Sequence, residues 1–414
     1  MKQTQLRWFE DVDRAVAERE AQIIEVRRHL HAHPELSGQE IETARYLAGH
    51  LEAAKLAVRT VVGGCGLIVD PPPAGAGGES VPCIALRADM DALRIQDAKS
   101  ADYRSRVPEV MHACGHDGHT AIVLGAALAL ADMTARGQAP WPIRWRAIFQ
   151  PAEETCRGAV QMIDVGALED VSAILALHMD PSRAVGTIGI RSGSFTADCD
   201  ELEIVIEGRG GHAARPHESL DPIAAAAQLI SSIYLFVPRA IDSHDPVVVT
   251  IGQIAGGDDY NVIPDRVEMR GTMRSFGGVV RQQALDHIRQ LARGVGEASG
   301  TQIGVRVGTG PPSVYNDAGL TDRLRTVARE LLGAGQVQEI ARPSMGGEDF
   351  AHYLDHVPGA MFRLGCSATV EGSAPLHTAD FDIHEPALAV GARLLARAVV
   401  ALSEPTGPLP ETTA

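Results

Sequence analysis

Apolar residues near the N-terminus recur with helical spacing. Over 13–31 they return every three or four positions on one face, and charged side chains occupy the other. HPELSG at 33–38 ends this pattern, and a second helical stretch follows over 41–56. The chain therefore begins with two predicted amphipathic helices.

Short apolar runs then alternate with helical stretches, and each run leads towards a polar cluster. The runs are Val81–Leu86, Ile143–Phe149, Ala173–Leu177 and Met361–Leu364, with helices predicted over 119–135 and 158–166. This alternation predicts a mostly parallel α/β sheet. Ligands of such sheets collect at the carboxyl ends of the strands, so we expect the polar clusters to converge on one site.

A different order of elements interrupts this pattern between about 192 and 310. Its predicted elements are a strand over 201–208, a helix over 221–236, strands over 246–254 and 265–275, a helix over 278–298 and a strand over 301–308. Asp221 and Pro222 suit the N-cap and first position of the first of these helices. The β-α-β-β-α-β order predicts an inserted ferredoxin-like unit.

The predicted boundaries follow from this interruption. Residues 1–190 and 311–402 form one discontinuous α/β domain, and residues 191–310 form the inserted domain. The Pro/Gly-rich stretch at 71–80 is expected to be an exposed loop, and residues 403–414 a disordered tail.

Composition narrows the class of protein. The 414 residues are 45% hydrophobic and carry a net charge of −16, without a basic run, so nucleic acid and anionic membranes are not expected partners. No stretch approaches the ~20 apolar residues of a membrane span, and the N-terminus lacks a signal-peptide core. The six scattered cysteines predict reduced thiols and a cytoplasmic protein.

Two motifs carry most of the candidate chemistry. MHACGHDGHT at 111–120 offers Cys114, His116, Asp117 and His119 within ten residues, and QPAEE places Glu153 and Glu154 after an apolar run. Thiolate, imidazole and carboxylate are the side chains that bind zinc-like metals. One glutamate can hold metal while its neighbour moves protons. The alternatives are a buried cysteine near a surface histidine, and a solvated helix start.

Four further residues join this candidate site only if the strand ends converge. His178 follows ILAL and His377 lies in PLHTADF; each could instead be a satisfied core histidine. Asp89 and Asp91 share one side of an extended segment, where they could orient metal-binding imidazoles or support the metal through its ligands. Salt bridges with Arg87 and Arg94 are the alternative for this pair.

Taken in order, nine motifs resemble one family. HAHPELS, LRADMDAL, MHACGHDGHTA, QPAEE, GGHAARPH, NVIP, GTMR, GGEDF and LHTADF are similar to the aminoacylase–hippurate hydrolase–auxin-conjugate hydrolase branch of the dinuclear metal-dependent carboxypeptidase/amidohydrolase family. The likeness runs from about 28 to 398. It implies a zinc-peptidase-like (phosphorylase/hydrolase-like) α/β catalytic domain that carries the ferredoxin-like insert as a lid, which often dimerises.

The resemblance also implies roles for individual residues. The residues that match the two-metal ligands of the branch are Cys114, His116, Glu154, His178 and His377, and Glu153 matches its general base. In the lid, His212, Asn261 and Arg274 match residues that bind the substrate carboxylate and polarise the scissile carbonyl. His212 often reaches the partner subunit's site. Gly346, Gly347 and Glu348 match the loop that frames the site.

One departure from the wider family concerns the metal. Its usual His-x-Asp motif reads Asp89-Met90-Asp91 here, as is normal for this branch, which uses Cys114 and His116 instead. A thiolate favours zinc, whereas relatives are often activated by manganese, cobalt or nickel. We therefore expect two divalent ions per subunit, zinc or manganese, with cobalt or nickel as alternatives.

The expected function is hydrolysis of the amide bond of a small-molecule N-acyl amino acid by a homodimer, with a tetramer as the alternative assembly. Within enzymes, a dipeptidase, an N-carbamoyl-amino-acid hydrolase and a biosynthetic N-acetyl deacetylase remain open. Outside enzymes, an inactive metal-binding protein remains open, although Glu153 would be superfluous in it.

Overall fold

The structure is a computed structural model that describes residues 2–72, 81–369, 371 and 373–405. They cluster into two compact units. The first unit covers Met1–Gly193, Tyr315–Arg342 and Asp349–Ala414, and the second covers Ser194–Val314 and Pro343–Glu348. Most of the predicted loop at 71–80 and of the predicted disordered tail at 403–414 lies outside the described residues.

An eight-stranded sheet forms the centre of the first unit, in the order β1-β2-β4-β3-β5-β16-β6-β15. The strands are β1 (Ala57–Val61), β2 (Gly66–Asp70), β3 (Cys83–Asp89), β4 (Arg144–Gln150), β5 (Val171–Ala184), β6 (Ile188–Ile190), β15 (Val337–Glu339) and β16 (Gly359–Ser367). The central strands β4, β3, β5 and β16 are parallel, as the sequence predicts.

The flanks of this sheet are antiparallel at β1-β2, β2-β4 and β16-β6. Short connections explain part of this difference from the predicted parallel arrangement. β1 and β2 are joined through the three-residue turn Val62–Gly64, whereas a parallel pair needs a crossover of a dozen or more residues.

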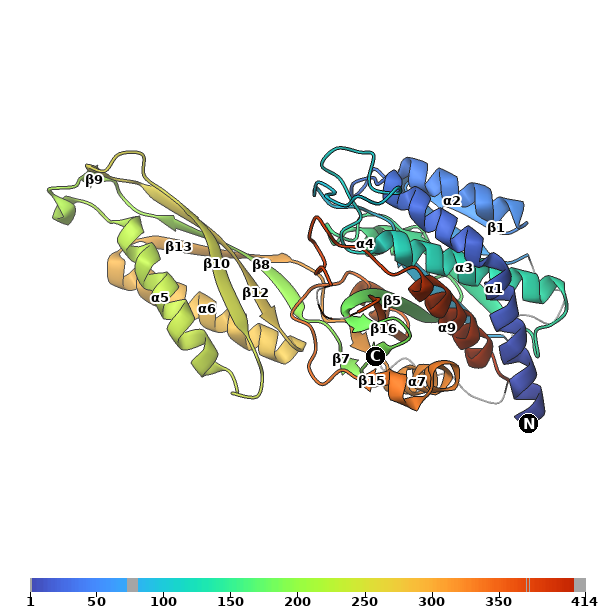
Figure 1. The fold of residues 1–414 in the computed structure, drawn as a ribbon. Coiled ribbons are helices and arrows are strands. Elements are labelled where there is room, and N and C mark those ends of the chain that lie inside the picture. The colour runs from blue at the N-terminus through green and yellow to red at the C-terminus, as the bar shows by residue number, and fades with distance from the viewer. Residues whose placement is uncertain (1, 73–80, 370, 372, 406–414) are drawn as a thin grey trace. The chain divides into compact units, whose positions relative to one another are not determined.

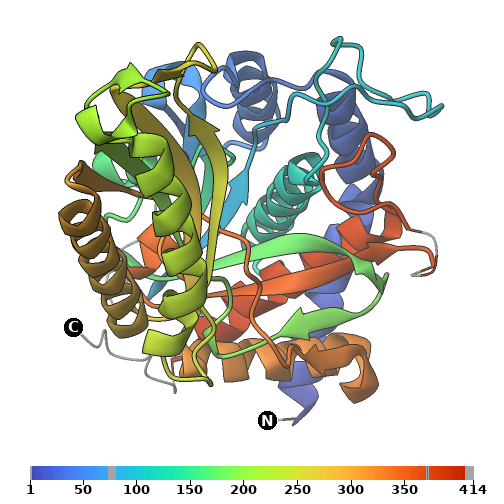
Figure 2. The same ribbon diagram turned by 90° about the vertical axis from the view of Figure 1, so that its left-hand side faces the viewer.

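Helices cover this sheet. They are α1 (Lys2–Ala32), α2 (Ile41–Ala53), α3 (His116–Ala135), α4 (Gly158–Asp164), α7 (Ala318–Leu332), α8 (Ala351–Leu354) and α9 (Pro386–Leu402). α3 contacts β3, β4 and β5 and also α1 and α9 (Figures 1 and 2). Because α3 is enclosed in this way, most of its side chains are buried, and beyond its polar first turn they are largely apolar around the whole helix.

α1 begins well before the predicted helix over 13–31. Trp8 and Phe9 in its first turns are buried, and the Arg397 guanidinium of α9 lies over the Phe9 ring at 4.4 Å. The helix extends to Lys2 because these aromatic side chains continue its buried face, which a strict search for aliphatic periodicity overlooks.

The second unit is a four-stranded antiparallel sheet, in the order β10-β12-β8-β13, with two helices. Its main elements are β8 (Asp198–Glu207), α5 (Pro222–Ala240), β10 (Val248–Ala255), β12 (Arg266–Ser275), α6 (Gly278–Ser299) and β13 (Gln302–Thr309). This is the β-α-β-β-α-β order that the sequence predicts. The Asp221 side chain caps α5 by accepting from the backbone N–H groups of Ile223 and Ala224.

Four two-residue strands are also present: β7 (Gly193–Ser194), β9 (Gly211–His212), β11 (Val262–Ile263) and β14 (Tyr315–Asn316).

Among the described helices, α3 and α5 are long and apolar enough to cross a membrane by length and composition alone. The apolar window of α3 is 78% buried, as expected of a core helix, and that of α5 is 28% buried.

The boundaries of the second unit differ from the predicted 191–310. The segment Pro343–Glu348, predicted with the catalytic domain, belongs to the second unit. Its backbone is bonded there: Ser344 N–H donates to the Phe195 carbonyl, and Ala197 N–H donates to the Gly346 carbonyl. Such long-range backbone pairing leaves no pattern in the sequence.

Candidate metal centre and substrate-contacting residues

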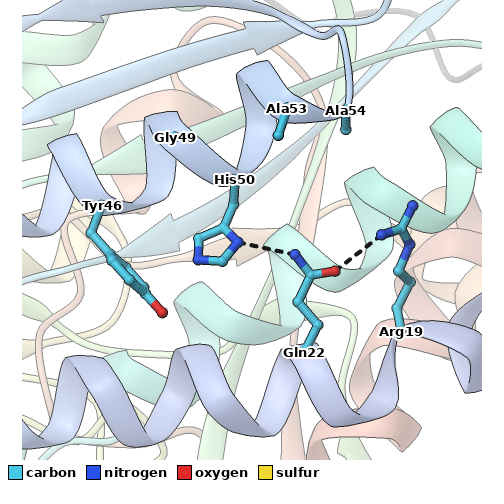
Figure 3. Close-up of a pocket in the computed structure, with 7 residues that line it drawn as sticks. All are labelled: Arg19, Gln22, Tyr46, Gly49, His50, Ala53 and Ala54. Carbon is cyan, nitrogen blue, oxygen red and sulfur yellow. Dashed lines mark hydrogen bonds between the residues drawn. The ribbon is translucent and has the colours of Figure 1, made fainter.

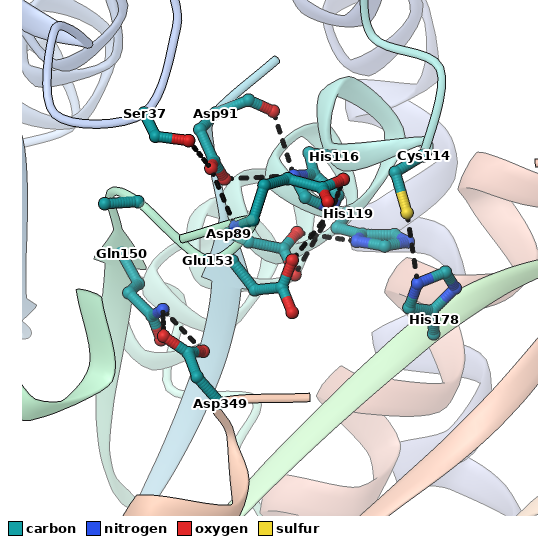
Figure 4. Close-up of polar contacts among 12 residues, drawn as sticks. Ser37, Asp89, Asp91, Cys114, His116, His119, Gln150, Glu153, His178 and Asp349 are labelled. Atoms are coloured by element: carbon teal, nitrogen blue, oxygen red, sulfur yellow. Dashed lines mark hydrogen bonds and ion pairs between the residues drawn. The ribbon is translucent and has the colours of Figure 1, made fainter. Parts of the chain in front are cut away.

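The predicted metal-binding side chains of the first unit meet at the carboxyl ends of its parallel strands, and Figure 4 shows Cys114, His116 and His178 among them. Asp89 ends β3, Glu153 and Glu154 follow β4, and His178 lies in β5. Cys114 and His116 stand at the start of α3, and His377 lies between β16 and α9. The convergence expected from the sequence is therefore present within this unit.

Two unusual backbone conformations bring these donors together. Gly115, between Cys114 and His116, has φ of 90°, and a Cβ there would meet the Met179 side chain at 3.0 Å. His377 has φ of 62°, which is uncommon for a residue with a side chain, and its N–H donates to the Ala113 carbonyl at 2.8 Å. This bond fixes the His377 loop directly beside Cys114.

One group of donor atoms surrounds the Cys114 sulfur. Cys114 Sγ lies 3.4 Å from His178 Nε2 and 3.3 Å from His377 Nε2. His377 Nε2 lies 3.5 Å from Glu154 Oε1. Ligands at ~2.0–2.3 Å from a tetrahedral ion are themselves roughly 3.3–3.8 Å apart, so these spacings suit atoms that share a metal.

A second group centres on His116. Its Nε2 lies 3.8 Å from Glu153 Oε2 and 3.9 Å from Glu154 Oε1. Both His116 Nε2 and Glu154 Oε1 are buried and have no hydrogen-bond partner among the described residues. Buried polar atoms are seldom left without a partner. A cation between them would satisfy both, so the donor set fits two divalent metal ions.

Hydrogen bonds on the far side of two imidazoles, His116 and His178, orient these rings. His116 Nδ1 lies 2.9 Å from the Asp91 carbonyl oxygen and 3.2 Å from Asp91 Oδ1, and His178 Nδ1 lies 2.8 Å from the Met179 carbonyl oxygen. Because these oxygen atoms accept hydrogen bonds, Nδ1 of each ring must carry a proton. The neutral ring then directs the lone pair of Nε2 at the cluster. Asp91 therefore orients a candidate ligand, as one of its two interpretations predicted.

The other two polar side chains of the MHACGHDGHT motif have different partners. His119 Nδ1 donates to Asp89 Oδ1 at 2.6 Å, and its Nε2 accepts the Met179 N–H at 2.9 Å. Both nitrogens are thus engaged. Asp117 accepts from Arg27 Nε and His31 Nδ1, each at 2.8 Å. Asp117 therefore holds α3 in place, whereas His119 lies beside the metal cluster, in a candidate donor group with Asp89 and His116, but already has a partner at each nitrogen.

Asp89 supports the cluster as a buried anion. Its Oδ2 accepts from Arg87 at 2.6 Å, which is the salt bridge that the sequence left open, and His119 holds its other oxygen. Burial alone would raise the pKa of Asp89, but His116, His119 and Arg87 hold that pKa well below its usual range. Arg87 also donates to Asp349, a partner that the sequence did not indicate.

Two of the candidate ligands, Cys114 and Glu154, are poorly ionised without a cation. Burial raises the pKa of the Cys114 thiol to about 12, against the opposing effect of His116. Burial also raises the pKa of Glu154. A metal ion supplies the positive charge that stabilises the thiolate and the carboxylate in such surroundings.

In the second unit, His212 lies at the exposed tip formed by β9 and β11. The Asn261 carbonyl accepts from Ala213 N–H at 3.1 Å, which places Asn261 beside His212. His212 Nδ1 accepts from Ala214 N–H, also at 3.1 Å. The neutral ring then carries its proton on Nε2, where it can be donated.

Arg274 lies near the other end of that unit's sheet. It pairs with Cys199 across β12 and β8 and donates to the Cys199 sulfur. A Cβ on Gly347 would stand 2.8 Å from Cys199 Sγ and 3.4 Å from Arg274 Nη1, so only glycine fits against this pair. Arg274 and the Gly346–Gly347 loop, both predicted, are thus neighbours, whereas the sequence did not indicate Cys199.

One groove of about 300 Å³ in the first unit contains none of the candidate metal donors (Figure 3). Its lining residues come from α1 and α2 and the residue after α2, and are Arg19, Gln22, Tyr46, Gly49, His50, Ala53 and Ala54. Arg19 is already paired with Asp132, and His50 with Gln22.

Comparison with known proteins gives consistent matches over most of the chain. Residues 85–401 match the model of peptidase family M20/M25/M40. A probable hydrolase of Synechocystis is 44% identical over 89% of this chain and 92% of its own. An N-acetylcysteine deacetylase of Bacillus subtilis is 40% identical over 92% of this chain and 97% of its own. The crystal structure of a dinuclear metal-binding M20 peptidase of Bacillus subtilis is 37% identical, with a TM-score of 0.78 over 92% of this chain and 97% of its own.

Proposed function

Because the chain belongs to peptidase family M20/M25/M40, we propose that it hydrolyses the amide bond of N-acyl amino acids. The chain is a metal-dependent amidohydrolase, and the finer assignment concerns its substrate. The products would be a carboxylic acid and a free amino acid. The observation that supports this most is the pair of donor groups around Cys114 and His116, with Glu153 beside them.

The proposed ligands are Cys114, His116, Glu154, His178 and His377. Cys114 is central among them, because its sulfur lies close to two sets of candidate donors, one with His116 and His178 and the other with Glu154 and His377. When bound, the two ions supply Lewis acidity, which polarises the amide carbonyl and acidifies the attacking water. Zinc is the metal that a thiolate ligand favours, with manganese, cobalt and nickel as alternatives.

Glu153 is the proposed general base. Its Oε2 lies 3.8 Å from His116 Nε2, at the edge of the donor cluster, and its side chain is only 10% exposed. It would take the proton of the attacking water and pass it to the nitrogen of the leaving amine. Glu154 Oε1 lies 3.9 Å from His116 Nε2 and 3.5 Å from His377 Nε2, so Glu154 would remain a metal ligand.

Two residues of the second unit would recognise the substrate. Arg274 would pair with the carboxylate of the amino-acid half through its planar guanidinium. His212 would donate a hydrogen bond from its Nε2–H to the oxyanion that develops on the scissile carbonyl. Asn261, beside His212, would assist at the same position.

These two roles require a second subunit. β12 separates the His212 tip from Arg274, and Arg266 to Arg274 alone spans roughly 27 Å along the strand. An N-acyl amino acid is far shorter, so it cannot touch both residues of one chain. We therefore propose a homodimer in which each site receives His212 from the partner.

The substrate class is tested with purified enzyme and a panel of compounds. The panel contains N-acetyl, N-benzoyl and N-indoleacetyl amino acids, matched dipeptides and N-carbamoyl amino acids, in both chiralities. Release of free amino acid from the N-acyl members above all others supports the proposal. Preference for dipeptides or carbamoyl compounds would replace it with one of the alternatives.

A further inference from the structure

The N-terminal motif HAHPELS and the residues after it have no role in the function described so far. This segment runs from the end of α1 to the start of α2 and ends at Glu40, whose side chain is completely buried. Glu40 Oε1 accepts two backbone N–H groups, from Ala152 at 2.8 Å and from Gly38 at 3.0 Å. The first of these contacts joins the segment to the turn that carries Glu153.

That turn has an unfavourable backbone. Ala152 has φ of 55° and Cys156 has φ of 54°, a region that residues with side chains rarely occupy. Such a conformation persists only where surrounding contacts enforce it. Glu40 supplies one such contact, at the residue immediately before Glu153.

A second buried carboxylate holds the residue immediately after Glu153. Glu154 N–H donates to Asp91 Oδ2 at 3.0 Å, and Ser37 Oγ donates to the same oxygen at 2.7 Å. The N–H groups on either side of Glu153 are thus each held by a carboxylate from outside the turn. Both connections involve the segment 37–40, directly through Glu40 and through Ser37 and Asp91.

We propose that Glu40 is a positioning residue for Glu153, because it fixes the strained turn that aims the carboxylate of the base. This inference rests on the proposed role of Glu153. Its physical basis is the steep dependence of proton transfer on geometry, since a misplacement of ~1 Å can cost about 100-fold in rate. Glu40 would act without touching the substrate.

For the positioning of Glu153, the hydrogen-bond acceptor of the Glu40 side chain matters more than its negative charge. Burial raises the pKa of Glu40 from its ordinary 4.5 to about 7, against the lowering effect of its two N–H donors. Glutamine keeps the Oε1 acceptor and the shape of the side chain, whereas alanine removes both. Leucine fills the space without an acceptor, which separates the lost hydrogen bond from a cavity.

The test compares Glu40→Gln, Glu40→Leu and Glu40→Ala. We expect Glu40→Gln to keep kcat within about threefold, and the other two to lower kcat by roughly 10- to 100-fold with a nearly unchanged KM. Glu35→Ala is the matched control. Glu35 lies in the same segment and accepts the Thr43 N–H at 2.8 Å, at the start of α2 rather than in the turn. A loss in Glu35→Ala as large as in Glu40→Leu would overturn the proposal.

A double-mutant cycle shows whether Glu40 acts through Glu153. In a Glu153→Gln background, adding Glu40→Leu should change turnover by less than about threefold, because the group that it positions is already disabled. Equal losses in both backgrounds would contradict the proposal.

A measurement that does not depend on enzymatic activity separates this inference from the proposed function. Hydrogen exchange of the backbone amides over 150–158 should accelerate in Glu40→Leu and Glu40→Ala and stay near wild type in Glu40→Gln. Unchanged exchange in all three variants would contradict the proposal even if the enzyme is active. If exchange responds as expected but wild type cleaves no N-acyl amino acid, the proposed function fails and the contact stands.

Discussion

In the second unit, Arg274 lies near one end of β12, and His212 lies in the two-stranded β9-β11 pair beyond the other end of that strand. This separation makes the assembly testable by complementation. Glu153→Gln and His212→Ala chains, each nearly inactive alone, are co-expressed with different tags and purified as hybrids. Because a hybrid dimer holds one site with intact Glu153 and an intact His212 from the partner, we expect about half of wild-type activity.

The control for this experiment is a hybrid of Glu153→Gln and Glu154→Gln chains. Both changes lie in the same turn of the first unit, so no site in that hybrid is complete. Activity restored in neither hybrid would show that His212 acts within its own chain.

Cys114 should be needed for metal content as well as activity. In Cys114→Ala we expect loss of at least one ion per subunit and a parallel loss of turnover, measured by elemental analysis and a hydrolysis assay. Cys366→Ala is the matched control. Cys366 is also a buried thiol of the first unit with its pKa raised by burial to about 12, but it is not among the described donor groups. Equal metal content in both variants would exclude Cys114 as a ligand.

Arg274 should bind the free carboxylate of the substrate. A charge-assisted hydrogen bond contributes ~1.5–3 kcal/mol, so Arg274→Ala should lower kcat/KM by roughly 10- to 150-fold. Lysine should rescue only part of this, because it lacks the planar fork. Arg270→Ala, an exposed arginine of the same strand, is the control and should be near wild type. The discriminating substrate is the carboxamide: wild type should reject it strongly and Arg274→Ala should not.

Glu40 should make stability depend on pH in a defined direction. Its pKa in the folded state, about 7, lies above its ordinary value of 4.5, so the folded state binds the proton more tightly than the unfolded state. The resulting stabilisation is fully present below pH 4.5 and is lost as the pH rises through 7. Relative to wild type, the Tm of Glu40→Gln should therefore increase between pH 5 and pH 8. A constant difference in Tm across that range would contradict the shifted pKa.

Local patterns in the sequence were sufficient for much of the fold. The central parallel strands and the Asp221 cap of α5 follow from hydrophobic runs and turn chemistry, which act over a few residues. The antiparallel flanks of the large sheet and the transfer of Pro343–Glu348 to the second unit depend on pairing between distant segments. No local preference encodes such pairing in a single sequence.

The candidate site, like the fold, was predicted where local sequence patterns suffice and not where contacts between distant residues decide. Strand-end convergence predicted that Glu154 and His178 would approach Cys114, and each of them does, in a separate donor group. Residue type and spacing could not separate His116 from His119, which are three residues apart at the start of one helix, and only the family resemblance selected His116. Their difference arises from hydrogen bonds with Asp89, Asp91 and Met179, which exist only in the folded chain.

Cys199 and Glu40 were not predicted for a related reason. A lone cysteine in a strand and a glutamate before a helix both have ordinary explanations in a sequence. Their significance lies in contacts with Arg274 and with Ala152, at sequence separations of 75 and 112 residues.

The most direct test of the central claim is the turnover of an N-acyl amino acid by Glu153→Gln carrying its full metal content. Wild type should release free amino acid and carboxylic acid in equal amounts. Glu153→Gln should retain both ions and lose at least ~10² in kcat, the scale of general base catalysis. Glu154→Gln, measured beside it, should instead lose metal. Wild-type turnover by metal-loaded Glu153→Gln would contradict the assignment. Metal loss from Glu153→Gln together with full metal retention by Glu154→Gln would contradict it as well.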